Sequence, residues 1–111
     1  MRKFIFPLLL AATISSAPRI ARSADTVPQF DIARNCKAET ADMSGIGETL
    51  ASCMKDEEDA RGQLAEQWDR FAREDKAACI RATSADGTPS YVELVTCLEI
   101  AYDRARFRAK Q

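Results

Sequence analysis

The sequence lacks histidine altogether, and it has only one tryptophan, four glycines and four prolines in 111 residues. Without histidine, zinc, haem and acid–base sites lose their commonest ligand or proton carrier. The sequence also lacks the G-x-S-x-G motif of serine hydrolases. A pair of carboxylates for glycoside hydrolysis would need a cleft, which a chain of this size rarely encloses. We therefore expect no catalytic residue, no cofactor and no metal site, and predict that the protein is not an enzyme.

No apolar run in the sequence is long enough to cross a membrane. The run over residues 4–14 (FIFPLLLAATI) has eleven residues, whereas a spanning helix needs about 20. Arg2 and Lys3 precede the run and small residues follow it, which is typical of a secretory signal peptide. We predict a signal peptide over residues 1–24 and a mature domain over residues 25–111, periplasmic or secreted, without stable membrane insertion after signal removal. Cleavage after Ala17 and an uncleaved N-terminal anchor are the alternatives.

Neither sign of charge dominates the whole sequence, which has a net charge of −1. All four charged residues before residue 25 are basic, so the mature part keeps 12 basic and 17 acidic residues and has a net charge of −5. An acidic chain is a poor match for the phosphate backbone, so we expect no nucleic-acid partner.

The C-terminal end is the basic exception, because Arg104, Arg106, Arg108 and Lys110 surround Phe107. Cations in this place stabilise the end of a helix through its dipole. They also suit contact with an anionic surface, such as a cell-wall polymer, lipid headgroups or an acidic protein. The three arginines are therefore candidate partner contacts.

The four cysteines, Cys36, Cys53, Cys79 and Cys97, all lie in the predicted mature part. An even number of cysteines in a short exported chain indicates disulfides. Structural zinc sites place cysteines in close pairs, whereas the gaps here are 16, 25 and 17 residues. The sequence also has no C-x-x-C pair of the thioredoxin-like redox type. Disulfides are therefore favoured over a zinc site.

Geometry favours one of the three possible disulfide pairings. Cys36 and Cys53 flank a turn-like stretch (40–47) at similar distances, and Cys79 and Cys97 flank another (84–89). A weak internal repeat, in which residues 50–54 (LASCM) resemble residues 94–98 (LVTCL), supports the same pairing. We predict Cys36–Cys53 and Cys79–Cys97, each of which closes a helical hairpin between two antiparallel helices.

Strand signals are nearly absent, whereas apolar residues recur at the three- and four-residue steps of helices. The pattern predicts an all-α domain of about four helices, one of them long. The expected helices cover 29–38, 46–72 and 74–83, and a final one begins at 88–90.

The final helix has two possible starts. Thr88 can cap a helix whose first turn contains Pro89, and Ser90 with Glu93 forms the sequence of a capping box. The apolar stripes predict the core. The long helix contributes Ile46, Leu50, Cys53, Ala60, Leu64, Trp68 and Phe71, and the final helix contributes Leu94, Cys97, Leu98, Ala101 and Ala105.

Two further residues are possible partner contacts. Glu57 interrupts the apolar stripe of the long helix, although the acidic run around it (56–59, DEED) is typical of a solvated face. Its spacing from Arg61 also fits an ion pair within the helix. Tyr91, at the start of the final helix, is the aromatic residue that we expect to be exposed.

The cysteine framework and residues 64–68 (LAEQW) resemble the LprI-type lysozyme inhibitors, which are small exported helical domains with four cysteines. The matching residues are Cys36, Cys53, 64–68, Cys79 and Cys97. The resemblance implies an envelope protein that binds a cell-wall lytic enzyme, but it identifies no inhibitory residue. The chain is also similar to other four-cysteine periplasmic proteins of Gram-negative bacteria, and this second resemblance implies no function.

We therefore expect a non-enzymatic periplasmic or secreted binding protein that is monomeric or associates weakly and has an envelope protein as its partner. The first hypothesis is an inhibitor of a cell-wall lytic enzyme, as the resemblance implies. The alternative is an acid- or stress-response protein with a chaperone-like role. Protonation of its 17 carboxylates would make the acidic chain strongly positive.

Overall fold

The computed structural model describes residues 26–41 and 49–111, and within these ranges the chain is helical without any strand. In chain order the elements are α1 (Ile32–Thr40), α2 (Leu50–Gln67), the 3-10 turn η2 (Trp68–Arg70), α3 (Arg73–Ser84) and α4 (Tyr91–Ala109). The predicted all-α class with about four helices is confirmed. No helix of the described ranges has an apolar stretch that could cross a membrane.

The long helix is shorter than predicted, and α4 is one residue longer than α2. The sequence pattern predicts one helix over 46–72, but α2 has 18 residues and α4 has 19. Thr49 begins α2, because its hydroxyl accepts a hydrogen bond from the Ser52 amide at 3.1 Å. Positions 46–48 of the expected helix lie outside the described residues. At its other end α2 passes into η2, and Phe71 then adopts an extended backbone that turns the chain towards α3.

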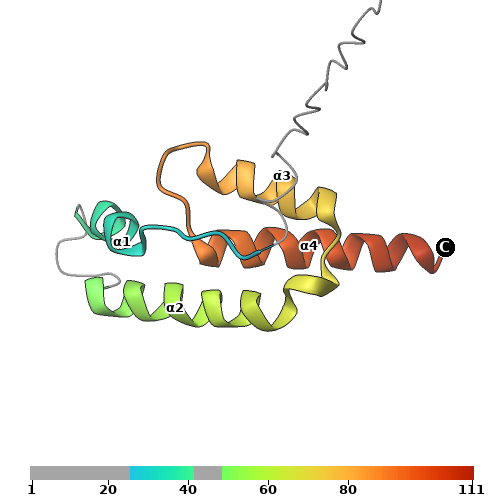
Figure 1. Cartoon of the computed structure of the whole chain (residues 1–111), viewed down its shortest axis with the longest axis horizontal. Helices are drawn as coiled ribbons and strands as arrows, with labels where there is room; N and C mark the ends of the chain where they lie inside the picture. The colour runs from blue at the N-terminus through green and yellow to red at the C-terminus, as the bar shows by residue number, and fades with distance from the viewer. Residues whose placement is uncertain (1–25, 42–48) are drawn as a thin grey trace, which may run out of the picture.

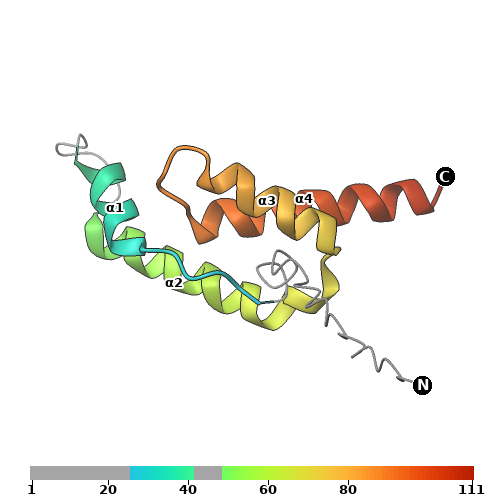
Figure 2. The same cartoon turned by 45° about the horizontal axis from the view of Figure 1, so that its top comes forward.

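Three helices lie side by side with α4 between α2 and α3 (Figure 1). In both views α3 runs opposite to α4, whereas α2 runs broadly in the same direction as α4 (Figures 1 and 2). The contact between α2 and α4 is the most extensive, followed by α3 with α4 and α1 with α2. The C-terminal part of α4 extends beyond the other helices (Figure 1).

Both predicted disulfides are present. Cys36–Cys53 joins α1 to α2, and Cys79–Cys97 joins α3 to α4. The second disulfide closes an antiparallel pair of helices, as expected. The first pair differs from the expectation, because the short α1 lies across the first turns of α2 instead of running antiparallel along it (Figure 2).

The core lies where α2, η2, α3 and α4 meet. The predicted core residues Leu64, Trp68, Phe71, Leu94 and Leu98 are at most 5 % exposed. Leu50 and Ala105, near the outer ends of the two apolar stripes, are exposed instead. Lys76 of α3 is also buried, with its ammonium group 5.0 Å from the centroid of the Trp68 ring. The segment before α1 adds Val27 and Phe30 to this core. Phe30 belongs to the helix expected over 29–38, but α1 begins only at Ile32, so Phe30 reaches the core from a non-helical segment.

A tight turn between α3 and α4 places the start of α4. Gly87 has a φ of 81°, which side chains with a Cβ rarely adopt. The Asp86 carboxylate accepts hydrogen bonds from the Thr88 amide and hydroxyl at 3.0 and 3.1 Å. These bonds lower the pKa of Asp86 below its usual value. The turn places Ser90 at the start of α4, in contact with α2.

Candidate functional site

The start of α4 is held by a carboxylate from another helix. Ser90 is the N-cap of α4, so of the two predicted starts the capping-box serine is the one used. The Glu57 carboxylate of α2 accepts hydrogen bonds from the Ser90 hydroxyl at 2.5 Å and from the Tyr91 amide at 2.6 Å. Glu57 is 2 % exposed. A negative charge at the positive end of a helix dipole stabilises the helix, so Glu57 fixes α4 on α2.

The end of α3 joins the same group of hydrogen bonds. The Thr83 hydroxyl accepts a hydrogen bond from the Ser90 amide at 2.9 Å and donates to the Glu93 carboxylate at 2.8 Å. The Ser90 hydroxyl in turn accepts a hydrogen bond from the Glu93 amide at 3.3 Å. The capping box is therefore only half formed, because Thr83 takes the place of the Glu93 side chain at the Ser90 amide. We call Glu57, Thr83, Ser90, Tyr91 and Glu93 the capping network.

Tyr91 ties the N-terminal segment to this network. Its hydroxyl donates to the Pro28 carbonyl at 2.7 Å and accepts from the Phe30 amide at 2.8 Å, and the Phe30 and Tyr91 ring centroids are 4.7 Å apart. Tyr91 is 1 % exposed. The prediction that Tyr91 is exposed is therefore wrong, because the segment before α1 covers it.

Replacing Tyr91 by phenylalanine is expected to lower the free energy of unfolding by about 1–2 kcal/mol. The ring stays in the core, but the Pro28 carbonyl and the Phe30 amide lose their partner. Urea unfolding of the two proteins measures the difference, and hydrogen exchange of the Phe30 amide reports the local effect. Tyr102→Phe is the matched control, since Tyr102 is only partly buried. An equal loss in both variants would contradict this role of Tyr91.

The surroundings of Glu57 also differ from the predicted solvated face. Its neighbours Asp56, Glu58 and Asp59 are exposed, as expected for a solvated face, but Glu57 itself is buried. It contacts α4 instead of pairing with Arg61, whose guanidinium lies 6.0 Å from the Tyr91 ring centroid. Glu57 is thus occupied within the fold, and neither it nor Tyr91 is part of an exposed contact surface.

A small hollow beside the capping network carries four carboxylates. It has a volume of about 300 Å³, and its lining includes Glu39, Asp56, Glu57 and Glu93. Nevertheless, nowhere in residues 26–41 and 49–111 are three or more side chains grouped so that they could hold a metal ion.

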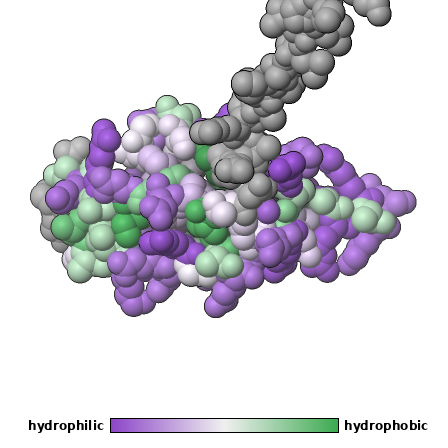
Figure 3. All heavy atoms as spheres, viewed as in Figure 1, coloured by the Kyte–Doolittle hydropathy of each residue, from purple (hydrophilic) through white to green (hydrophobic). Residues whose placement is uncertain are grey.

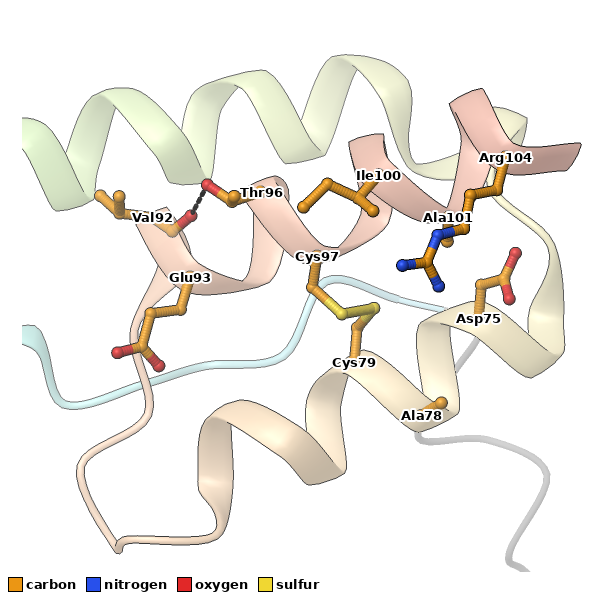
Figure 4. A pocket seen from close by; sticks show the side chains of 10 residues that line it. All are labelled: Asp75, Ala78, Cys79, Val92, Glu93, Thr96, Cys97, Ile100, Ala101 and Arg104. Carbon is orange, nitrogen blue, oxygen red and sulfur yellow. Dashed lines mark hydrogen bonds between the residues drawn. A yellow bond between two sulfur atoms is a disulfide. The ribbon is translucent and has the colours of Figure 1, made fainter. Parts of the chain in front are cut away.

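The outer face of α4 exposes apolar side chains at helical spacing. Val92, Ile100 and Phe107 are 40 %, 50 % and 68 % exposed. Thr96 lies on the same face, and its hydroxyl donates to the Val92 carbonyl at 2.8 Å, so that the hydroxyl is bonded to its own helix (Figure 4). We call Val92, Thr96, Ile100 and Phe107 the α4 stripe.

A groove of about 630 Å³ follows this stripe along the side where α3 meets α4. The Cys79–Cys97 disulfide joins the two helices here, between Glu93 at one end and Arg104 with Asp75 at the other (Figure 4). A second hollow of about 580 Å³ continues along α4 and is lined by Ile100, Asp103, Arg104, Phe107 and Arg108. The exposed face therefore runs along nearly all of α4.

The last part of the chain, residues 103–111, is exposed at every position, and we call it the α4 arm. Figure 3 shows hydrophilic residues around a narrow apolar band on this projecting end. Arg106 lies 5.7 Å and Arg70 lies 4.3 Å from the centroid of the Tyr102 ring at the base of the arm. Arg104 and Arg108 lie beside Phe107 in the second hollow. The three arginines that the sequence marks as candidate contacts are thus on an exposed surface.

No protein-family model, no curated protein and no solved structure matches the chain. The resemblance to LprI-type inhibitors therefore stays a prediction from the cysteine spacing and the LAEQW segment.

Sequence reasoning missed the capping network and the α4 stripe. The position of Glu57 on an apolar stripe, with Cys53, Ala60 and Leu64, was the available signal that it is buried. For the α4 stripe, the 3–4-residue spacing of Val92, Thr96, Ile100 and Phe107 was visible, but only the position of α3 decides which face of α4 is left open.

Proposed function

We propose that this protein is an exported, non-enzymatic binding protein of the cell envelope that inhibits a cell-wall lytic enzyme through its α4 arm. The observation that carries the proposal is the arm itself, which projects from the body and exposes Phe107 between Arg104 and Arg108. Exposed aromatic and arginine side chains are the residue types that contribute most to protein interfaces.

The charge of the arm suits such an enzyme. Glycosidases that cleave cell-wall polymers generally carry a pair of carboxylates at the reacting bond. Guanidinium groups form strong bidentate hydrogen bonds with carboxylates. The arm holds four basic residues and one acidic residue, so it is complementary to an acidic cleft.

Two further observations support the proposal. Three of the five buried polar residues in the described ranges, Glu57, Thr83 and Ser90, are engaged with each other in the capping network, so their hydrogen bonds serve the fold. The two disulfides are of the kind that persists in oxidising compartments, which favours a periplasmic or secreted location.

The test is a turbidity assay of cell-wall lysis by a c-type lysozyme and by a lytic transglycosylase. We expect the oxidised protein to slow lysis by at least one enzyme. The double variant Arg104→Glu with Arg108→Glu is expected to bind at least about tenfold more weakly, because two arginine contacts become repulsive. Glu58→Ala, an exposed change on α2, is the control that leaves inhibition intact. Undiminished lysis in excess protein, or equal inhibition by the double variant, would contradict the proposal.

A second candidate function is an acid response, and the buried Glu57 favours it. Glu57 lines the same small hollow as Glu39, Asp56 and Glu93, so four carboxylates lie together beside the start of α4. Acidification of an acidic chain favours expanded states that expose apolar surface. This function predicts that fluorescence of the dye ANS rises between neutral pH and pH 3 and that aggregation of a client protein falls. Unchanged ANS fluorescence would rule it out.

A further inference from the structure

The exposed apolar residues of α4 are spaced almost symmetrically about Ile100. Val92 lies eight residues before Ile100 and Phe107 lies seven residues after it. At 1.5 Å per residue these separations are about 12 and 10.5 Å along the helix. A helix with such a spacing presents nearly the same apolar pattern when its direction is reversed.

The charges of α4 are arranged with opposite signs at its two ends. Glu93 and Glu99 lie in the first half. The second half contains Asp103 but also Arg104, Arg106 and Arg108, and Lys110 follows directly after the helix. Two such helices side by side attract each other when they run antiparallel and repel each other when they run parallel. The helix dipoles favour the same antiparallel arrangement.

We propose that a second copy of this chain covers the α4 stripe, with the two α4 helices antiparallel about a two-fold axis at Ile100. Phe107 of each copy then packs against Val92 of the other. Arg108 lies on the same flank of α4 as Glu93, so Arg108 of one copy is level with Glu93 of the other. The contact is self-complementary and closes at two chains.

A second copy fits this face better than an anionic membrane does. Residues 25–102 contain 8 basic and 16 acidic residues, whereas the arm contains 4 basic and 1 acidic. An anionic lipid surface would attract the arm but repel the acidic body behind it. A second copy instead brings acidic groups to the arm. Because the stripe is small, the dimer forms in a concentration-dependent manner and is not permanent.

This inference goes beyond the proposed function. The arm cannot face an enzyme and a second copy at once, so the dimer and the inhibitory complex exclude each other. The test of the dimer uses no enzyme, and its outcome is therefore independent of whether lysis is inhibited.

Sedimentation equilibrium from micromolar to millimolar concentration tests the dimer. The protein is produced with its own N-terminal segment, so that it is exported and oxidised before purification. We expect a reversible monomer–dimer equilibrium, and Phe107→Ser is expected to raise its dissociation constant at least about tenfold. Arg108→Glu is expected to raise it about fivefold at low salt and less at high salt. Arg106→Glu makes the same charge change on the opposite flank and is expected to leave the constant nearly unchanged.

Cross-linking tests the register. A cysteine at the two-fold axis faces its own copy, so Ile100→Cys is expected to form a disulfide-linked dimer much faster than Glu99→Cys, an exposed neighbour. A monomer at millimolar concentration would overturn the proposal, as would equal effects of the Arg106 and Arg108 variants or equal cross-linking at positions 99 and 100. Binding to phosphatidylglycerol vesicles without self-association would assign the stripe to lipid and overturn it too.

Discussion

Replacing Glu57 by alanine is expected to lower the free energy of unfolding by about 3–4 kcal/mol. The variant leaves the Ser90 hydroxyl and the Tyr91 amide, both buried, without their acceptor. Each buried donor that loses its partner costs about 1–3 kcal/mol, and the favourable charge at the start of α4 is lost as well. Because Glu57 connects the two helices with the most extensive contact, the loss is expected to affect unfolding of the whole chain.

Glu58→Ala is the matched control for this prediction. Glu58 has the same side chain on the next position of α2 and is exposed, so its removal is expected to change stability by less than about 0.5 kcal/mol. Glu57→Gln keeps an acceptor and the size of the side chain, and we expect an intermediate loss. Urea unfolding followed by circular dichroism measures all three variants. A difference between Glu57→Ala and Glu58→Ala below about 1 kcal/mol would contradict the role assigned to Glu57.

Removing the two disulfides together is expected to leave the chain largely unfolded at 37 °C. The cysteines of each pair are 17 and 18 residues apart in the sequence. In the chain-entropy model, loops of this size stabilise a protein by about 3 kcal/mol each. The sum is comparable to the whole stability of a small domain, which is commonly about 5–15 kcal/mol.

The two disulfides are not expected to be equivalent. Cys79 belongs to the core cluster and its disulfide joins α3 to α4, so Cys79→Ser with Cys97→Ser adds a loss of core packing. Cys36→Ser with Cys53→Ser releases only α1 and is expected to leave α2, α3 and α4 folded. Thermal unfolding and hydrogen exchange of each pair distinguish these outcomes. If the variant without Cys36–Cys53 unfolded globally while the variant without Cys79–Cys97 stayed folded, this assignment would be contradicted.

The sequence predicts the helices and the disulfides because both depend on local sequence patterns. The helices follow from the 3.6-residue repeat of apolar residues, and the disulfide pairing follows from cysteines that flank two turns at similar distances. Local capping rules predict that α4 is capped by Thr88 or by Ser90, and in the structure the N-cap is Ser90.

Periodicity and capping rules do not predict the capping network, because its members are far apart in the sequence. Glu57 is 33 residues from Ser90, and the Tyr91 hydroxyl contacts Pro28, 63 residues away. Local sequence patterns contain no information on contacts between residues so far apart. The sequence therefore places Glu57 in a solvated acidic run and predicts an exposed Tyr91. The helix expected over 29–38 includes Phe30, but the structure begins α1 at Ile32, and the hydrogen bonds of Tyr91 to Pro28 and Phe30 show that this segment is positioned by the fold.

Hydrogen exchange of the protein with and without a cell-wall lytic enzyme tests the central claim most directly. The protein is kept at a concentration where it is monomeric, so that protection does not come from self-association. If the α4 arm binds the enzyme, amides over residues 99–109 become protected in the complex, whereas those of α1 and the first turns of α2 exchange as before. Protection confined to α1 and α2, or no protection at saturating enzyme, would contradict the account.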